Sequence, residues 1–242
     1  ADGAQSYKYV VRNVAQKFGK VATMMPKPIS MDSGSGMHTN VSLWKNDQNT
    51  FFDQESDLEL SQVGRYFCGG IMSHAKALTA ITNPTTNSYH RLVPGYEAPV
   101  YIAWSSSNRS ATIRIPAHFK GEKYAFMKRL EYRVPDPASN PYLVFSAVLA
   151  AGLDGIKKKM DPGDPVQEDI YKMSRSERRK RGIDTLPANL GRALDELESD
   201  RKFLSPIFTT PVLDKIIDLE RRDQREISIR PHPHEFYLYF DV

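Results

Sequence analysis

Two long apolar segments decide most of what this chain can fold into. Residues 60–81 (LSQVGRYFCGGIMSHAKALTAI) repeat their apolar side chains at helical spacing, and residues 140–160 (NPYLVFSAVLAAGLDGIKKKM) are rich in alanine and end in lysines. Gly69 and Gly70 permit a bend in the first segment or the close approach of another element. Both segments predict buried helices, against which the rest of the chain packs.

Short β-rich runs accompany these helices. Residues 111–116 (ATIRIP) and 129–135 (RLEYRVP) are each closed by proline, and they predict two strands that neighbour each other in one sheet. Residues 38–44 (HTNVSLW) alternate as a half-buried strand does. Further expected elements are a first helix, one more strand and two amphipathic surface helices, at residues 5–18, 20–25, 189–200 and 211–223. Strands that precede most of the helices predict an α+β fold.

The composition limits the partners of the chain. Its 242 residues are 40% hydrophobic and 26% charged, enough for a real core in one large or two small domains. The net charge of +4 is spread along the chain, so anionic small ligands explain it as well as nucleic acid does. Cys68 is the only cysteine, and no run of about 18 apolar residues is present. We therefore expect a cytoplasmic protein with no membrane or nucleic-acid partner, and the absence of an initial methionine suggests a processed or partial chain.

One charged run and one histidine pair have plain explanations. Residues 174–182 (SRSERRKRG) carry four arginines and one lysine, but no aromatic residues for base stacking lie among them. A solvated helical face or a subunit contact is favoured over nucleic-acid binding. His232 and His234 are two apart, and a zinc site needs more ligands than these two.

A glycine-containing turn precedes the strand expected at residues 38–44. Gly34 and Gly36 lack the Cβ atom that would keep backbone N–H groups away from a ligand, and such turns bind anions. In the strand that follows, alternation places His38, Asn40 and Ser42 on one face. An ordinary turn entering a strand whose polar face meets solvent gives the same pattern, and from the pattern alone that alternative is favoured.

Charged side chains on the other expected strands point to anions and cations. Glu131 and Arg133 are two apart and project to one side of a strand, where a carboxylate suits a hard cation and a guanidinium suits a carboxylate or phosphate. Arg109 in a loop and Arg114 on a strand can each bind phosphate oxygens in a bidentate manner. Scattered surface charges would look the same, and that alternative is again favoured from the residues alone.

The segment NPTTNSYHRLVPGYEAP, residues 83–99, predicts a long, rigid, polar loop. Its three prolines reduce the freedom of the unfolded chain, and Gly95 allows a turn. Glu97 is therefore held with a small entropic cost, and a fixed carboxylate can act as a base. A surface glutamate on a structural loop is an equal alternative.

Taken together and in this order, these motifs resemble the C-terminal catalytic part of glutamine synthetase. The matching segments are GSGMH, NPTTNSYHRLVPGYEAP, NRSATIRIP, EYRVPDPASNPYL and AGLDGIKKK, and the resemblance runs from MPKP to the closing RPHPHEF and LYFDV. For residues 1–242 it implies an α+β fold with an antiparallel curved sheet and packed helices. It implies an ATP-dependent ligase that joins ammonia to L-glutamate through γ-glutamyl phosphate, with Mg²⁺ or Mn²⁺, giving L-glutamine, ADP and phosphate.

The resemblance also implies roles for single residues. His38 and Glu131 match metal ligands of the family. Arg109 matches the arginine that reaches the transferring phosphoryl group, and Glu97 matches the flap glutamate that closes the site and takes a proton from ammonium. Both also lie at substrate-binding positions, and Arg109 at an ATP-binding one. The other matches are the glutamate-binding Ser33, Gly34, Arg91 and Arg133 and the ATP-binding Asn40, Ser42 and Arg114.

Some positions depart from the family pattern. Ser33 stands where many members carry asparagine, which weakens the expected contact with glutamate. The ATP-contacting lysine before Glu131 has no clear match, since Phe126 lies near its position and Lys123 or Lys128 would require a shift. Tyr171 matches a tyrosine that some bacterial members adenylylate, but the residues after it resemble the branch without that control, so we expect no modification.

The resemblance further implies parts outside this chain. The N-terminal β-grasp domain and the first catalytic strands of the family are expected to precede it, and active sites of the family form between subunits of a dodecamer. The chain alone is then expected to be nearly inactive. Two other functions stay open: a glutamate–amine ligase of the same fold, and a non-catalytic module that binds ligands or assembles with other subunits.

Overall fold

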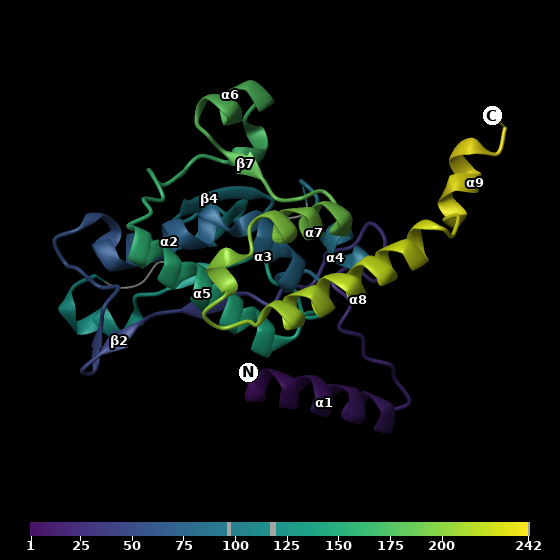
Figure 1. The fold of residues 1–242 in the computed structure, drawn as a ribbon, viewed down its shortest axis with the longest axis horizontal. Helices are drawn as coiled ribbons and strands as arrows, with labels where there is room; N and C mark the ends of the chain where they lie inside the picture. The colour runs from purple at the N-terminus through teal and green to yellow at the C-terminus, as the bar shows by residue number, and fades with distance from the viewer. Residues whose placement is uncertain (96–97, 117–119, 242) are drawn as a thin grey trace.

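The computed structural model describes residues 1–95, 98–116 and 120–241, and its centre is a five-stranded sheet (Figure 1). The strand order is β1-β6-β5-β4-β7. In this order the strands cover Thr39–Val41, Leu130–Tyr132, Ala111–Arg114, Tyr101–Ser105 and Asp184–Thr185. The expected strands at 111–116 and 129–135 are thus real and adjacent, and their antiparallel pairing joins Arg114 to Glu131. A small separate hairpin consists of β2 (Trp44–Lys45) and β3 (Gln48–Asn49).

The α+β class is confirmed, but the sheet is not wholly antiparallel. β4 and β5 run parallel, with Tyr101 opposite Ala111 and Ser105 opposite Arg114. Parallel neighbours require the connection to return to the start of the first strand. Residues 106–110 make that return. A pattern of short strands closed by proline does not predict whether neighbouring strands run parallel or antiparallel.

Helices cover the sheet and extend beyond it. Figure 1 shows α2, α3 and α5 packed together in the body, while α1 and α9 lie away from it. The α-helices from α1 to α9 cover Asp2–Lys17, Gln62–Ser73, Ala75–Thr82, Thr86–Arg91, Pro141–Lys158, Arg175–Lys180, Leu190–Ser199, Thr210–Ser228 and Pro233–Tyr239. Short 3-10 helices, η1 to η4, cover Asp57–Glu59, Glu122–Met127, Ile170–Lys172 and Lys202–Leu204. Within the described ranges, no helix combines the length and apolar character that crossing a membrane would require.

Two expectations about local structure were wrong. Residues 20–25 form no strand: they precede the glycine turn as largely exposed chain, and Val21 is 98% exposed. β-rich composition alone does not make a strand where no neighbour supplies the ladder. The segment at 83–99 is not a continuous loop, because α4 forms within it. The Thr85 hydroxyl accepts the N–H of Ser88 and the Ser88 hydroxyl accepts the N–H of Thr85, a reciprocal cap that starts this helix.

The helix expected at 60–81 is divided in two at His74, and its glycines serve close packing. A Cβ on Gly70 would lie 2.2 Å from the carbonyl oxygen of Ala151 on α5, and one on Gly155 would lie 2.3 Å from that of Tyr66 on α2. Real side chains do not approach so closely, so α2 and α5 are in contact through their backbones. This contact places α5 against the rest of the core.

Gly70→Ala should therefore destabilise the protein by at least about 2 kcal/mol, because the methyl group meets backbone that cannot rotate away. Thermal unfolding of the full protein measures the effect. Gly3→Ala is the matched control, since nothing lies within 4 Å of a Cβ at Gly3 in α1. Equal midpoints for the two variants would contradict the close helix contact.

His74 links three helical segments at the break between α2 and α3. Its Nδ1 lies 2.6 Å from Oδ2 of Asp200, its Nε2 lies 3.0 Å from Oδ2 of Asp154, and its ring stacks on Phe203 at 3.9 Å. Burial disfavours the charged ring, but the hydrogen bonds to Asp200 and Asp154 outweigh it and raise the pKa of His74. These contacts give His74 a structural role.

Stability should depend on pH through this histidine. Because the folded-state pKa lies above the ordinary 6.5, the contribution of His74 is complete below pH 6.5 and is lost as the pH rises through the folded-state pKa. Unfolding midpoints measured from pH 6 to pH 9 should fall less steeply in His74→Gln than in wild type. The exposed His90→Gln variant serves as control, and parallel curves for wild type and His74→Gln would disprove the assignment.

Candidate functional site

The register of three strands brings polar side chains into one row. Asn40 on β1 and Arg114 on β5 both lie opposite Glu131 on β6, so all three side chains occupy the same face of the sheet. The neighbouring row faces the core and contains Thr39, Tyr132 and Ile113. Alternation in the sequence predicted which neighbours share a face with Asn40 on its strand and with Glu131 on its strand. The register of the sheet shows that these two faces are the same one.

Glu131 is the centre of the row. Its side chain is 6% exposed, and Oε2 accepts from Nε and Nη2 of Arg114 at 2.9 and 2.5 Å. Oε1 lies 3.0 Å from Nη1 of Arg133 and 2.9 Å from Nδ1 of His38. Burial raises the pKa of Glu131, but the hydrogen bonds and charges of Arg114 and Arg133 outweigh it and lower the pKa. The carboxylate is therefore ionised at neutral pH.

His38 is the uncharged partner in this cluster. Burial and the nearby charge of Arg133 lower the pKa of its imidazole, and Glu131 compensates only in part. The contact with Glu131 is thus a hydrogen bond from a neutral ring to a carboxylate, rather than an ion pair. With Nδ1 donating, the lone pair lies on Nε2, where a ligand or proton can reach it.

Arg91 reaches the same region from α4. Its Nη1 donates to the carbonyl of Val134 at 2.7 Å and its Nη2 to that of Arg133 at 3.1 Å. Burial lowers the pKa of this guanidinium to about 10, which leaves it charged at neutral pH. A Cβ on Gly36 would lie 2.6 Å from Nη2 of Arg91 and 3.0 Å from Nε2 of His38, so only glycine allows the turn to pass this close.

The segment before this turn is fixed to α4. The side chain of Asn87 accepts the N–H of Lys27 at 2.8 Å and donates to its carbonyl at 2.9 Å. The carbonyl of Pro26 accepts the N–H of Ser35 at 2.8 Å, and a Cβ on Gly34 would lie 2.8 Å from the same oxygen. Gly34 and Arg91 are thereby held as one unit.

Other expected site residues lie at the margins of the cluster. Asn40 accepts from Nε of Arg129 at 3.0 Å, and the Ser42 hydroxyl accepts from the indole of Trp44 at 3.0 Å. Ser33 is exposed, and its N–H donates to the carboxylate of Asp32 at 2.7 Å. Their expected contacts with ATP or glutamate stay predictions.

Arg109 lies on the turn between β4 and β5. It is exposed. Burial is the main cause of the lowered pKa of Arg133, and the charge of Arg109 adds to it, so the two guanidiniums are within electrostatic reach. Asn108 fixes this turn by donating to the carbonyl of Glu168 at 2.6 Å and accepting the N–H of Ser110 at 2.9 Å. Glu97 lies outside the described residues.

The structure shows the surroundings of Lys128, one possible match to the ATP-contacting lysine of the family. Lys128 is 1% exposed and donates to the carbonyl of Leu58 at 2.6 Å, and burial lowers its pKa to about 8, so it serves the loop at η1 rather than the row of Glu131. Phe126 is 63% exposed. Arg129, whose guanidinium donates to Asn40, is a further cation beside the row that was not expected from the sequence. The signal was its position two residues before Glu131, which places both on one face of a strand.

Known proteins match this chain along its whole length. The model of the glutamine synthetase catalytic domain matches residues 1–239. Glutamine synthetase of Sulfolobus acidocaldarius is 57% identical over 100% of this chain and 51% of its own length, and that of Streptomyces coelicolor is 49% identical over 100% and 51%. The chain belongs to the glutamine synthetase catalytic-domain family.

Solved structures agree with this family assignment. A complex of GmaS with ADP has a TM-score of 0.87 and 35% identity, over 100% of this chain and 54% of that one. Plasmodium falciparum glutamine synthetase has a TM-score of 0.87 and 32% identity, over 98% and 53%. The chain thus spans about half the length of its glutamine synthetase relatives, and the match is with their C-terminal half, as the motifs implied.

Glutamine synthetases use divalent cations, and two residues of this chain have side chains of the types that bind such ions. His38 supplies a neutral imidazole and Glu131 an ionised carboxylate, 2.9 Å apart. Within the described residues, no third histidine, cysteine, aspartate or glutamate joins them. Mg²⁺ and Mn²⁺ take about six ligands, so these two residues can form only one side of a cation site.

Glu131→Gln should destabilise the protein by about 3 kcal/mol, because two guanidiniums are then left facing each other without their carboxylate. Glu168→Gln is the matched control: Glu168 pairs with Arg181 at 2.9 Å, both are about half exposed, and solvent screens the pair, so its loss should destabilise the protein much less. Denaturant unfolding of the full protein compares them. Similar costs for both variants would show that Glu131 does not hold the cluster.

Proposed function

We propose that this chain is the catalytic portion of an enzyme that joins ammonia to L-glutamate at the expense of ATP. The observation that carries the proposal is the convergence on Glu131: an ionised carboxylate, a neutral imidazole and two arginines share one sheet face, with Arg91 beside them. Such a set suits a reaction in which a cation, phosphates and a carboxylate substrate meet. Membership in the glutamine synthetase family supports it.

The resemblance to the family suggests roles for single residues. Arg91 and Arg133 would bind the carboxylates of glutamate beside the backbone of Gly34, with Ser33 at the margin. Arg114, Asn40 and Ser42 would face the nucleotide, and Arg109 the phosphoryl group in transfer. Guanidinium groups stabilise the charge that spreads over phosphoryl oxygens during this step. A solved structure of GmaS with the same fold is a complex with ADP, which supports a nucleotide on this face.

The proposed reaction has two steps. An oxygen of the glutamate side-chain carboxylate attacks the γ-phosphorus of ATP, and ADP leaves. Ammonia then attacks the acyl carbon of γ-glutamyl phosphate, and inorganic phosphate leaves. Glu97 would take the proton that ammonium or the attacking nitrogen gives up, while its loop excludes water that would hydrolyse the acyl phosphate. When bound at His38 and Glu131, Mg²⁺ or Mn²⁺ would neutralise phosphate charge.

Further parts of the protein would complete the site. β6 is the only neighbour of β1 in the described sheet, and a cavity of about 310 Å³ lies beside this edge, lined in part by Phe145, Val148 and Leu149 of α5. Strands of the other half of the relatives' length would pair here and supply the missing ligands. We further propose a homo-oligomer, a dodecamer as in the family, that works in the cytoplasm without nucleic acid or membrane.

A phosphate-release assay on the full protein tests the function. With ATP, glutamate and Mg²⁺, release should require ammonium, and Glu97→Ala should lower turnover by about 100-fold or more, in the range that a positioned acid or base contributes. Glu226→Ala, an exposed change on α8, is the control. Full activity of Glu97→Ala would refute its role.

The same assay separates the alternatives. Faster turnover with a small organic amine than with ammonium would favour the glutamate–amine ligase. No release with either nucleophile would favour a non-catalytic module. Residues 1–242 alone should release little phosphate, since His38 and Glu131 supply too few ligands, and substantial glutamine synthesis by them would contradict that expectation.

A further inference from the structure

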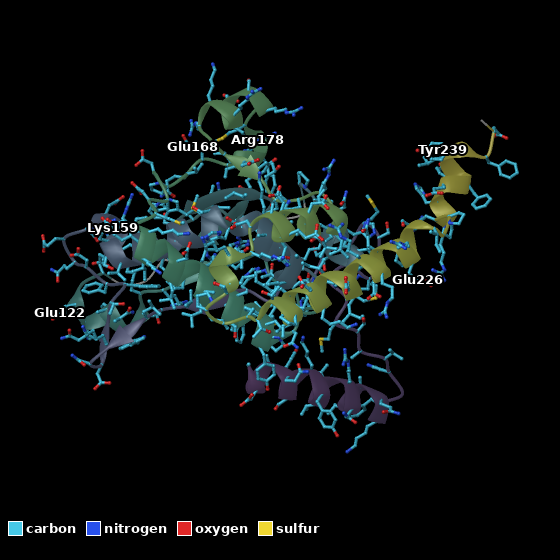
Figure 2. All side chains as sticks on the ribbon, in the orientation of Figure 1. Glu122, Lys159, Glu168, Arg178, Glu226 and Tyr239 are labelled. Atoms are coloured by element: carbon cyan, nitrogen blue, oxygen red, sulfur yellow. The ribbon has the colours of Figure 1, made fainter. Side chains whose placement is uncertain are left out.

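A basic segment that the proposed function leaves unused stands out from the body. Residues 173–185, which we call the α6 arm, carry α6 and end in β7, and Figure 1 shows α6 projecting beyond the sheet. The arm is anchored at its base. Arg178 stacks over the ring of Tyr101 on β4 at 4.9 Å, and β7 pairs with the first residues of β4. Figure 2 labels Arg178 and Glu168 at this base.

The arm contains a cavity with three arginines in its lining. Its volume is about 440 Å³, and its lining includes Arg175, Arg178 and Arg179. These three are spaced i, i+3 and i+4 on α6, so they share one face of the helix. Gly182, Ile183 and the two residues of β7 form the rest of the lining.

Nearby carboxylates do not neutralise this face. Glu177 is engaged at the N-terminus of α6, where it accepts the N–H of Ser174 at 2.7 Å. Asp184, the only acid among the described residues of the lining, lies 2.5 Å from Nζ of Lys76. Glu168 pairs with Arg181, which lies outside the lining.

Two arginines are therefore left for a ligand. Within the described residues, the guanidiniums of Arg175 and Arg179 have no hydrogen-bond or ion-pair partner, and both side chains are exposed. A third charge, Arg178, is fixed in place beside them. Guanidinium forks match the oxygens of phosphate groups, and adjacent like charges gain most from a multivalent anion.

We propose that the α6 arm binds a small anion with two or more phosphate groups, such as inorganic polyphosphate or the phosphates of a nucleotide. The site is separate from the row of Glu131 and does not depend on the synthetase activity. Because β7 and Arg178 both contact β4, and β4 pairs with β5 beside Arg114, the anion is bound next to the strands that carry the candidate site.

Isothermal titration of the full protein with inorganic tripolyphosphate, without divalent cations, tests the proposal. Arg175→Gln with Arg179→Gln should weaken binding at least tenfold. The control pair Lys172→Gln with Lys180→Gln makes the same change of charge on exposed residues nearby, outside the lining, and should weaken it less than threefold. Arg175→Lys with Arg179→Lys should retain binding only in part, because lysine supplies charge without the guanidinium fork.

A second arm of the titration distinguishes the sources of phosphate. If ADP binds the arm more tightly than pyrophosphate, and both lose affinity in the Arg175→Gln, Arg179→Gln protein, the ligand is a nucleotide. Equal affinities indicate a phosphate site without base recognition, and either result supports the proposal. The proposal is overturned if the wild-type protein binds no tripolyphosphate at millimolar concentration, or if the arginine and the lysine double variants weaken binding equally. It is also overturned if Arg175→Gln with Arg179→Gln changes the oligomeric mass and leaves the affinity unchanged.

Discussion

The buried carboxylate of Glu131 is the interaction on which the rest of the site depends. An isolated carboxylate at 6% exposure would lose its charge, since burial raises its pKa. Arg114, Arg133 and His38 reverse this outcome, and each comes from a different place: β5, the residue after β6, and the turn before β1. One charge thus ties three strands together, and the same charge is what a cation or a proton would meet.

This arrangement requires a rigid support behind the sheet. α5 packs on α2 through Gly70 and Gly155 with backbone in contact, which leaves no room for the two helices to slide. Beside them, Asn83 donates to the carbonyl of Val134 and to Asp136, and Arg91 donates to the same carbonyl. The end of β6 is therefore fixed from both sides, and the positions of Glu131 and Arg133 follow from it.

The sequence predicts the parts of this site that obey a local period. Alternation placed Glu131 and Arg133 on one side of a strand, and they are in contact. Helical spacing predicted both buried helices, and of the two possibilities at Gly69 and Gly70, a bend or the close approach of another element, the structure shows the close approach at Gly70. The reciprocal cap at Thr85 and Ser88 was also readable, but the prolines around it made the segment look like a loop. A cap that satisfies backbone N–H groups favours a helix even between prolines.

What the sequence does not predict is set by contacts distant along the chain. No local pattern shows that Arg114 will meet Glu131 rather than solvent, because that depends on the register of β5 with β6. Lys128 looked like a candidate for the nucleotide, yet a carbonyl 70 residues away holds it in the core. The resemblance to glutamine synthetase implies the roles, and the structure adds a constraint: Glu131 is already paired with two arginines, so a cation held by His38 and Glu131 would have to compete with Arg133 for this carboxylate. In the proposed enzyme, further ligands from outside these residues would have to favour the cation in that competition, so the cation site would form only together with the parts that supply them.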